Sequence, residues 1–92
     1  MTTPIRPLST LRPGEAGRVD HLDLPADVGL KLMEMGMGIG EKVIFLRQAP
    51  FGGPIEIELM GFRMALRNSE AEKIFLHVDS NAHHENRPAQ PG

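Results

Sequence analysis

The sequence predicts a small, mainly β fold of the barrel type, with one short helix near its beginning. Two observations predict this fold class. Short apolar and β-branched segments alternate with turns rich in glycine and proline, and only one early stretch has helical spacing. Nine of the ten glycines lie between Gly14 and Gly61, where the corners of a small barrel need residues that reach positive φ at little cost.

Five segments are expected to form strands. The clearest is Ile55–Leu59, in which apolar and charged residues alternate strictly, as in a strand with one buried face. Phe62–Leu66 continues this pattern after Gly61, which indicates a tight turn or bulge between two paired strands. The remaining three are Lys42–Gln48, 74–78 and, with a weaker pattern, Ala16–Leu22.

The helix is expected to start after Pro25 and to end at Gly36, which stands where a left-handed C-cap residue belongs. Helical spacing is shared by Val28, Leu32 and Met35, and also by Leu30 and Met33. Farther on, Ser69 and Glu72 match a capping box, which predicts one helical turn before the last strand.

The chain is expected to form a single folded unit over residues 1–79, followed by a tail over 80–92. The tail is made almost wholly of polar residues, proline and glycine, so it cannot bury enough apolar surface to offset the entropy of ordering. We therefore predict that the tail is disordered.

Composition excludes several classes of function. The chain has no cysteine, which removes thiolate metal sites and thiol nucleophiles. The net charge of −2 and the absence of Trp and Tyr argue against nucleic-acid binding. No apolar run is long enough for direct membrane insertion, and no signal-peptide core is present, so we expect a cytoplasmic protein.

Two ordered series of residues resemble the FeoA-like family of ferrous iron transport proteins. The first series is Leu8, Leu11, Pro13, Gly14 and Gly17, followed by Leu32-Met33-Glu34-Met35-Gly36-Met37 and by Gly40. The second is Ala49-Pro50-Phe51-Gly52-Gly53-Pro54-Ile55, followed by Gly61, Ala65, Leu66, Arg67, Glu70 and Ala71.

The resemblance implies a stand-alone SH3-like barrel that acts as a small accessory or regulatory protein of bacterial ferrous iron uptake. It also implies a partner, the membrane ferrous-iron transporter that carries a cytosolic GTP-binding domain, which would hold this protein at the periphery of the inner membrane. No catalytic motif is present, so no enzyme activity is expected. The run Gly36-x-Gly38-x-Gly40 follows a helix and precedes a strand, which is the reverse of a phosphate-binding loop.

The first candidate contact site for the partner is the segment Pro50, Phe51, Gly52, Gly53 and Pro54. The prolines and glycines would form a rigid loop that presents Phe51 near its tip. The alternative is that Phe51 turns inward and caps the barrel. The sequence leaves both open.

The methionines are the second candidate. We expect Leu32, Met35 and Met33 to be core residues at one end of the barrel, and Met37, beyond the helix end, to face a partner. A methionine cluster is a poor ligand set for ferrous iron.

The histidines support an alternative function, a carrier or sensor of ferrous or other transition metals. His83 and His84 have suitable ligand types, but in a flexible tail we expect only weak, adventitious binding of a divalent metal, and no cofactor. His77 is expected to point outward from the last strand, and His21 to lie near the end of the first.

Two further expectations concern the barrel wall. Glu56 and Glu58 are expected to face Arg63 and Arg67 across neighbouring strands as part of a solvated surface. If the protein forms a weak homo-oligomer, its exposed strand edges are the expected route. Recognition of polyproline peptides is not expected, because the chain has no Tyr or Trp to line such a groove.

Overall fold

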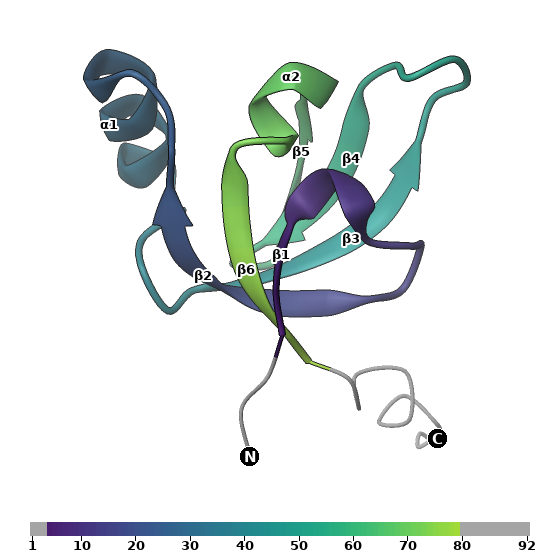
Figure 1. Cartoon of the computed structure of the whole chain (residues 1–92), viewed down its shortest axis with the longest axis horizontal. Coiled ribbons are helices and arrows are strands. Elements are labelled where there is room, and N and C mark those ends of the chain that lie inside the picture. The colour runs from purple at the N-terminus through teal and green to yellow at the C-terminus, as the bar shows by residue number, and fades with distance from the viewer. Residues whose placement is uncertain (1–3, 80–92) are drawn as a thin grey trace.

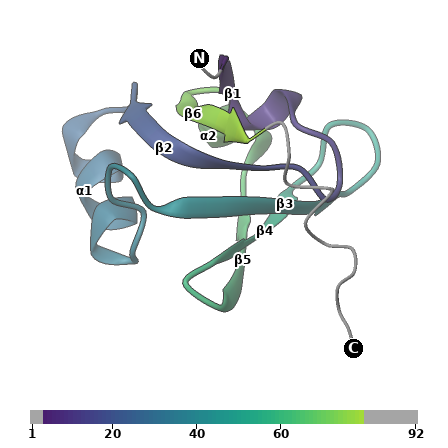
Figure 2. The ribbon, with the colours of Figure 1, turned by 90° about the horizontal axis from the view of Figure 1, so that it is seen from below.

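The computed structural model describes residues 4–79, which form one six-stranded antiparallel sheet in the order β1-β6-β2-β3-β4-β5. The sheet curls around its inner face, as Figures 1 and 2 show from two directions. Within the described residues, β1 and β5 at its two ends do not pair with each other, so the barrel stays open. The small barrel expected from the sequence is confirmed. The predicted disorder of 80–92 lies outside the described residues.

Five of the six strands were expected, and their bounds agree closely. They are β2 (Ala16–Leu22), β3 (Lys42–Gln48), β4 (Ile55–Leu59), β5 (Phe62–Leu66) and β6 (Ile74–Asp79). The sixth, β1 (Ile5–Pro7), was not expected, because it has three residues, follows Pro4 and ends in a proline itself. It is followed by a single 3-10 turn, η1 (Leu8–Thr10).

Helix α1 (Ala26–Glu34) lies at one end of the curled sheet and ends in a Schellman motif (Figure 1). Gly36 has φ +110°, and the N–H of Met37 donates to the carbonyl of Leu32 at 3.0 Å while the N–H of Gly36 donates to Met33 at 3.0 Å. This pattern satisfies carbonyls that the helix end would otherwise leave unpaired. The predicted C-cap at Gly36 is confirmed.

The second helix, α2 (Asn68–Ala71), is the expected single turn, but its cap lies two residues earlier than predicted. Arg67 is the N-cap residue, and its N–H donates to Glu70 Oε1 at 3.0 Å. Ser69 therefore lies inside the turn, so the predicted role of Ser69 and Glu72 is wrong. In the predicted and in the observed capping box alike, a glutamate side chain accepts from the N–H of the residue three positions earlier. The helical turn itself was therefore predicted correctly.

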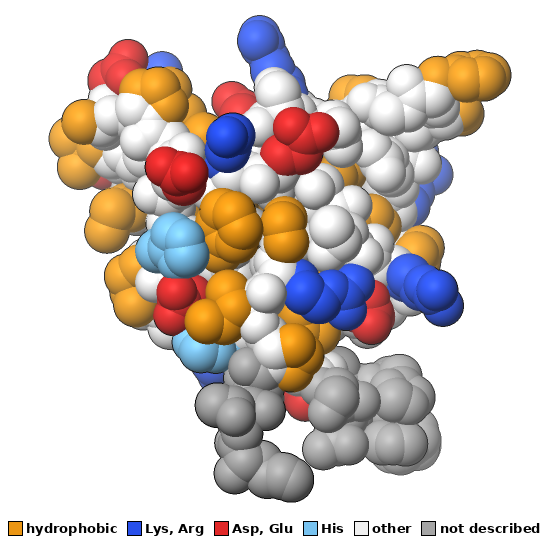
Figure 3. All heavy atoms as spheres, in the orientation of Figure 1, with side chains coloured by type: hydrophobic (Ala, Val, Ile, Leu, Met, Phe, Trp, Pro, Cys, Tyr) orange, Lys and Arg blue, Asp and Glu red, His pale blue; other side chains and the backbone are white. Residues whose placement is uncertain are grey.

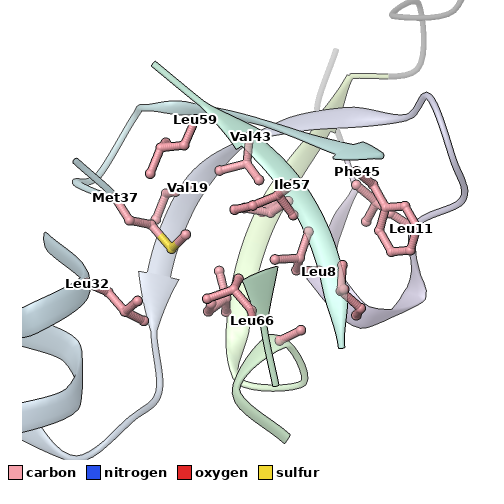
Figure 4. Close-up of a cluster of buried hydrophobic side chains, with 14 of the residues drawn as sticks. Leu8, Leu11, Val19, Leu32, Met37, Val43, Phe45, Ile57, Leu59 and Leu66 are labelled. Atoms are coloured by element: carbon pink, nitrogen blue, oxygen red, sulfur yellow. The ribbon is translucent and has the colours of Figure 1, made fainter. Parts of the chain in front are cut away.

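The core fills the concave side of the sheet and is apolar throughout. Figure 4 shows side chains from β2, β3, β4 and η1 meeting at its centre, with Leu32 and Met37 entering from the α1 side. The buried cluster consists of Leu8, Leu11, Val19, Leu32, Met37, Val43, Phe45, Ile55, Ile57, Leu59, Leu66, Ala71, Ile74, Leu76 and Val78. Burial of this surface is the main term that stabilises the fold.

Candidate docking surface

The loop formed by residues 49–54, between β3 and β4, is closed by its own hydrogen bonds. Ala49 N–H donates to the carbonyl of Pro54 at 2.9 Å, and Gly53 N–H donates to that of Pro50 at 3.2 Å. Gln48 Nε2 donates to the carbonyl of Gly53 and to Asn68 Oδ1, both at 3.0 Å, so the loop is also tied to α2. These contacts fix a loop that projects from the body of the protein (Figure 1).

Phe51 lies at the tip of this 49–54 loop with its side chain in solvent. Its relative exposure is 104%, and its φ is +61°, a conformation that costs a non-glycine residue about 1–2 kcal/mol. The next residue, Gly52, has φ +71°. The expected position near the tip is confirmed, and the alternative that Phe51 caps the barrel is wrong.

Apolar side chains also gather on the outer side of α1, as Figure 3 shows together with those of the projecting loop. Leu30 is 59% exposed, Met33 46% and Met35 54%. The prediction that Met33 and Met35 are core residues is wrong. Val28, Gly29 and Leu32 form the inner face of the short helix, and Met35 lies beyond its last turn as the C-cap residue.

Met37 is also placed differently from the prediction, because it is fully buried. In the Schellman motif it is the second residue after the cap, a position whose apolar side chain packs back onto the helix, here next to Leu32 (Figure 4). Met37 therefore cannot face a partner. An apolar residue directly after the capping glycine was the signal in the sequence that could have revealed this.

A second exposed turn lies between β4 and β5. Met60 and Gly61 have φ +54° and +84°, which is the signature of a two-residue type I′ turn. The sulfur of Met60 lies against Gly36, where an added Cβ would be only 2.6 Å away. The β4–β5 turn is therefore packed against the end of α1, although Met60 remains 62% exposed.

A carboxylate that joins two histidines was not predicted. Asp20 Oδ2 accepts from His21 Nδ1 at 2.6 Å, and Asp20 Oδ1 accepts from His77 Nε2 at 2.7 Å. Asp20 is the extra residue of a β-bulge between β2 and β6, which re-aims its side chain toward His77. The hydrogen bonds from His21 and then His77 hold the pKa of Asp20 below its ordinary value.

The surroundings of this cluster bear on metal binding. His21 stacks on Phe75 with ring centroids 4.6 Å apart, and a groove of about 440 Å³ beside His77 is lined by Asp20, Ile39 and Lys42 among others. Within residues 4–79, no group of three or more His, Cys, Asp or Glu side chains is arranged to hold a metal ion. His83 and His84 lie outside the described residues, so their predicted weak metal binding stays a prediction.

Of the charge pairs expected on the barrel wall, one pair of facing positions is found, but neither Arg63 nor Arg67 forms an ion pair within the described residues. Glu58 stands opposite Arg63 in the β4–β5 register, whereas Glu56 Oε1 pairs with Arg47 Nε on β3 at 3.3 Å. The pairing of Glu56 with Arg47 was not predicted. No helix in the described part of the chain is long and apolar enough to cross a membrane.

The chain matches one family model and is similar to several solved structures. The model of the FeoA domain family matches residues 6–78. The FeoA protein of Chlorobium tepidum is 32% identical, with a TM-score of 0.76 over 100% of this chain and 82% of that one. An iron uptake regulatory protein (FeoA) is 29% identical, with a TM-score of 0.72 over 83% of this chain and 99% of that one. No curated protein sequence matches the chain significantly.

A third similar structure bears on the fold class. FeoA of Stenotrophomonas maltophilia, in complex with zinc, is 31% identical, with a TM-score of 0.64 over 89% of this chain and 93% of that one. That protein is described as a unique procaryotic SH3-domain protein and a candidate activating factor of bacterial ferrous iron transport. The SH3-like fold implied by the sequence resemblance is thereby confirmed. The family match spans nearly the whole described region, so this chain belongs to the FeoA domain family, which is associated with ferrous iron transport.

Proposed function

We propose that this protein is a non-catalytic accessory protein of bacterial ferrous iron uptake that binds the cytosolic side of a membrane ferrous-iron transporter. The part of the transporter that we expect it to meet is the GTP-binding domain. Membership of the FeoA family supports the association with ferrous iron transport. The single observation that supports a docking role is the fully exposed Phe51 on the 49–54 loop.

Holding Phe51 in its observed conformation costs free energy that no burial of its side chain offsets. A phenylalanine at φ +61° is strained by about 1–2 kcal/mol, and its full exposure recovers none of this through burial. Burying the same side chain in a partner's pocket would gain about 1.5–3 kcal/mol. Because the loop is already closed by its own hydrogen bonds, little ordering entropy would oppose binding.

The alternative function, a carrier or sensor of ferrous or other transition metals, has less support. The zinc of the Stenotrophomonas protein belongs to that structure. In this chain, the described residues contain no set of three suitable ligands, and Asp20 is engaged with His21 and His77. We therefore favour the docking role.

The test is recovery of a complex between this protein and the purified GTP-binding domain of the transporter, with and without guanine nucleotide. Phe51→Ala should weaken binding roughly tenfold or more, as expected for a central aromatic contact. Met60→Ala is the matched control, because it removes an exposed apolar side chain from the other turn. Retention of wild-type affinity by a folded Phe51→Ala variant would contradict the proposal, and so would failure of the wild type to bind.

A test in cells complements this one. Deletion of the protein should reduce ferrous iron uptake, and the wild-type chain should restore it. Phe51→Ala should restore uptake poorly although the variant accumulates to the same level. Uptake that does not change on deletion would exclude the proposed role.

A further inference from the structure

The two edges of the open sheet differ in how well they are protected. The outer edge of β1 is only three residues long and carries Pro7, which has no backbone N–H to offer an added strand. The outer edge of β5 has five residues, no proline and an uninterrupted register with β4. An edge of the second kind can accept a further strand.

The register shows which backbone groups of β5 are available. Leu59 and Phe62 close a two-residue turn and therefore form a hydrogen-bonded pair, as do the pairs two residues farther along. It follows that the N–H and C=O groups of Arg63 and Ala65 point away from β4. In residues 4–79 no other strand pairs with β5 on that side, and Figure 2 shows β5 at the margin of the sheet.

The exposed side chains beside the outer edge of β5 are basic on one face of the sheet and apolar on the other. Arg63, Ala65 and Arg67 are exposed and follow one another at every second position, so they share the outer face. Neither arginine has an acidic group within ion-pair distance in the described structure. Phe62, on the opposite face, is 76% exposed and leaves an apolar surface beside the edge.

Pairing of β5 with β5 of a second copy does not suit this edge. An antiparallel arrangement would place Arg63 and Arg67 of one chain close to the same residues of the other, and like charges on facing strands are destabilising. An acidic strand would instead bring carboxylates to both arginines. β4 of the same sheet already has this pattern, with Glu56 and Glu58 opposite Ala65 and Arg63.

We propose that the outer edge of β5 binds an extended acidic segment of another protein as an additional antiparallel strand. Backbone groups of Arg63 and Ala65 would pair with that segment. Its carboxylates would face Arg63 and Arg67, and its apolar residues, on alternate positions, would pack against Phe62. This surface is separate from the 49–54 loop and does not depend on the role proposed for Phe51.

The experiment titrates the full ¹⁵N-labelled chain with a short capped peptide of alternating Glu and Val, and follows the backbone amides. The amides of Arg63 and Ala65 should change most. Ala65→Pro removes the outward N–H and should weaken binding roughly tenfold or more, whereas Ala65→Ser keeps the N–H and should bind as the wild type does. Arg63→Gln with Arg67→Gln should weaken binding about three- to tenfold.

Two controls test whether binding depends on the acidic residues of the peptide and whether it is independent of Phe51. A peptide with Lys in place of Glu should bind much more weakly, and Phe51→Ala should bind the acidic peptide like the wild type. If Ala65→Pro does not fold, the double glutamine variant decides the question. The proposal is overturned if the wild type does not bind the acidic peptide, if the glutamine variant binds it equally well, or if the Lys peptide binds as tightly.

Discussion

Two turns of this protein share a local conformation but differ in what it achieves. Phe51-Gly52 and Met60-Gly61 each place a large apolar residue and then a glycine at positive φ. Met60 lies with its sulfur against Gly36 at the end of α1, whereas Phe51 is fully exposed. In the β4–β5 turn, a contact within the fold therefore offsets the backbone strain. In the 49–54 loop, no contact of the Phe51 side chain offsets it.

The difference suggests how to tell a structural turn from a functional one. Strained residues persist only where the surrounding structure holds them, and they cluster at binding sites. At the β4–β5 turn, the hairpin itself needs positive φ at both positions, so the strain belongs to the fold. In the 49–54 loop, the strained residue holds an aromatic ring in solvent, where the described fold gives it no burial, and this is the basis of the proposal that a partner covers it.

The largest effect on this comparison is expected from Gly36→Ala. The new Cβ would meet the Met60 sulfur at 2.6 Å, and φ +110° is unfavourable for alanine. We expect the free energy of unfolding to fall by about 1–3 kcal/mol. Chemical denaturation measures it, with Gly40→Ala as the control, since Gly40 also has a positive φ of +87° but nothing lies within 4 Å of a Cβ there. An equal loss in the control would show that the contact with Met60 does not matter.

A smaller effect is expected when each apolar side chain is shortened. Met60→Ala removes the contact with Gly36 and should lower the free energy of unfolding by about 0.5–1 kcal/mol. Phe51→Ala should leave the unfolding midpoint unchanged, because the ring is fully exposed. The same denaturation experiment tests both. The comparison breaks down if Phe51→Ala destabilises the protein as much as Met60→Ala.

Relief of strain in the 49–54 loop should stabilise the protein. Phe51→Asn replaces a bulky residue at φ +61° by one that tolerates the left-handed conformation, and we expect a gain of about 0.5–1 kcal/mol. Thermal unfolding checks the sign. A lower melting temperature would mean that Phe51 makes a stabilising contribution that its exposure does not reveal.

The smallest expected effect concerns pH and lies outside both turns. Neither turn carries a titratable group, so acid sensitivity should arise at Asp20, whose folded-state pKa is lowered by hydrogen bonds from His21 and His77. A lowered carboxyl pKa adds stability above the unfolded value of 3.8, and this stability is lost as the pH falls through the lower folded value.

Asp20→Asn should therefore be less stable than the wild type near neutral pH, and the two should converge as the pH falls below about 4. Unfolding midpoints measured between neutral and acidic pH provide the check. The turn variants should keep the acid dependence of the wild type. A constant difference between Asp20→Asn and the wild type at every pH would argue against this origin.

Much of the sheet was predictable because alternation of apolar and charged residues fixes both period and face, as in Ile55–Leu59. β1 was missed because a strand of three residues that ends in a proline has no periodic signal. The bulge at Asp20 was also missed, because a bulge depends on pairing with β6, far away in the chain. Its contact with His77 therefore could not be read from local sequence.

The candidate docking surface was predictable only in part. The prolines and glycines around Phe51 indicated a rigid loop, but the sequence alone did not decide whether the ring faces solvent. Met37 was misplaced because helical spacing says nothing about the chain after a capping glycine, where the Schellman motif turns the next side chain inward. The difference between the two sheet edges appears only once the strand order is known.

The most direct test of the central claim measures binding and stability side by side for Phe51→Ala and Met60→Ala. Each purified variant is titrated with the GTP-binding domain of the ferrous-iron transporter, and its unfolding is followed separately. We expect Phe51→Ala to lose affinity for the domain at unchanged stability, and Met60→Ala to keep its affinity at reduced stability. Equal affinity of the two variants, with Phe51→Ala still folded, would contradict the assignment of the 49–54 loop as the docking site.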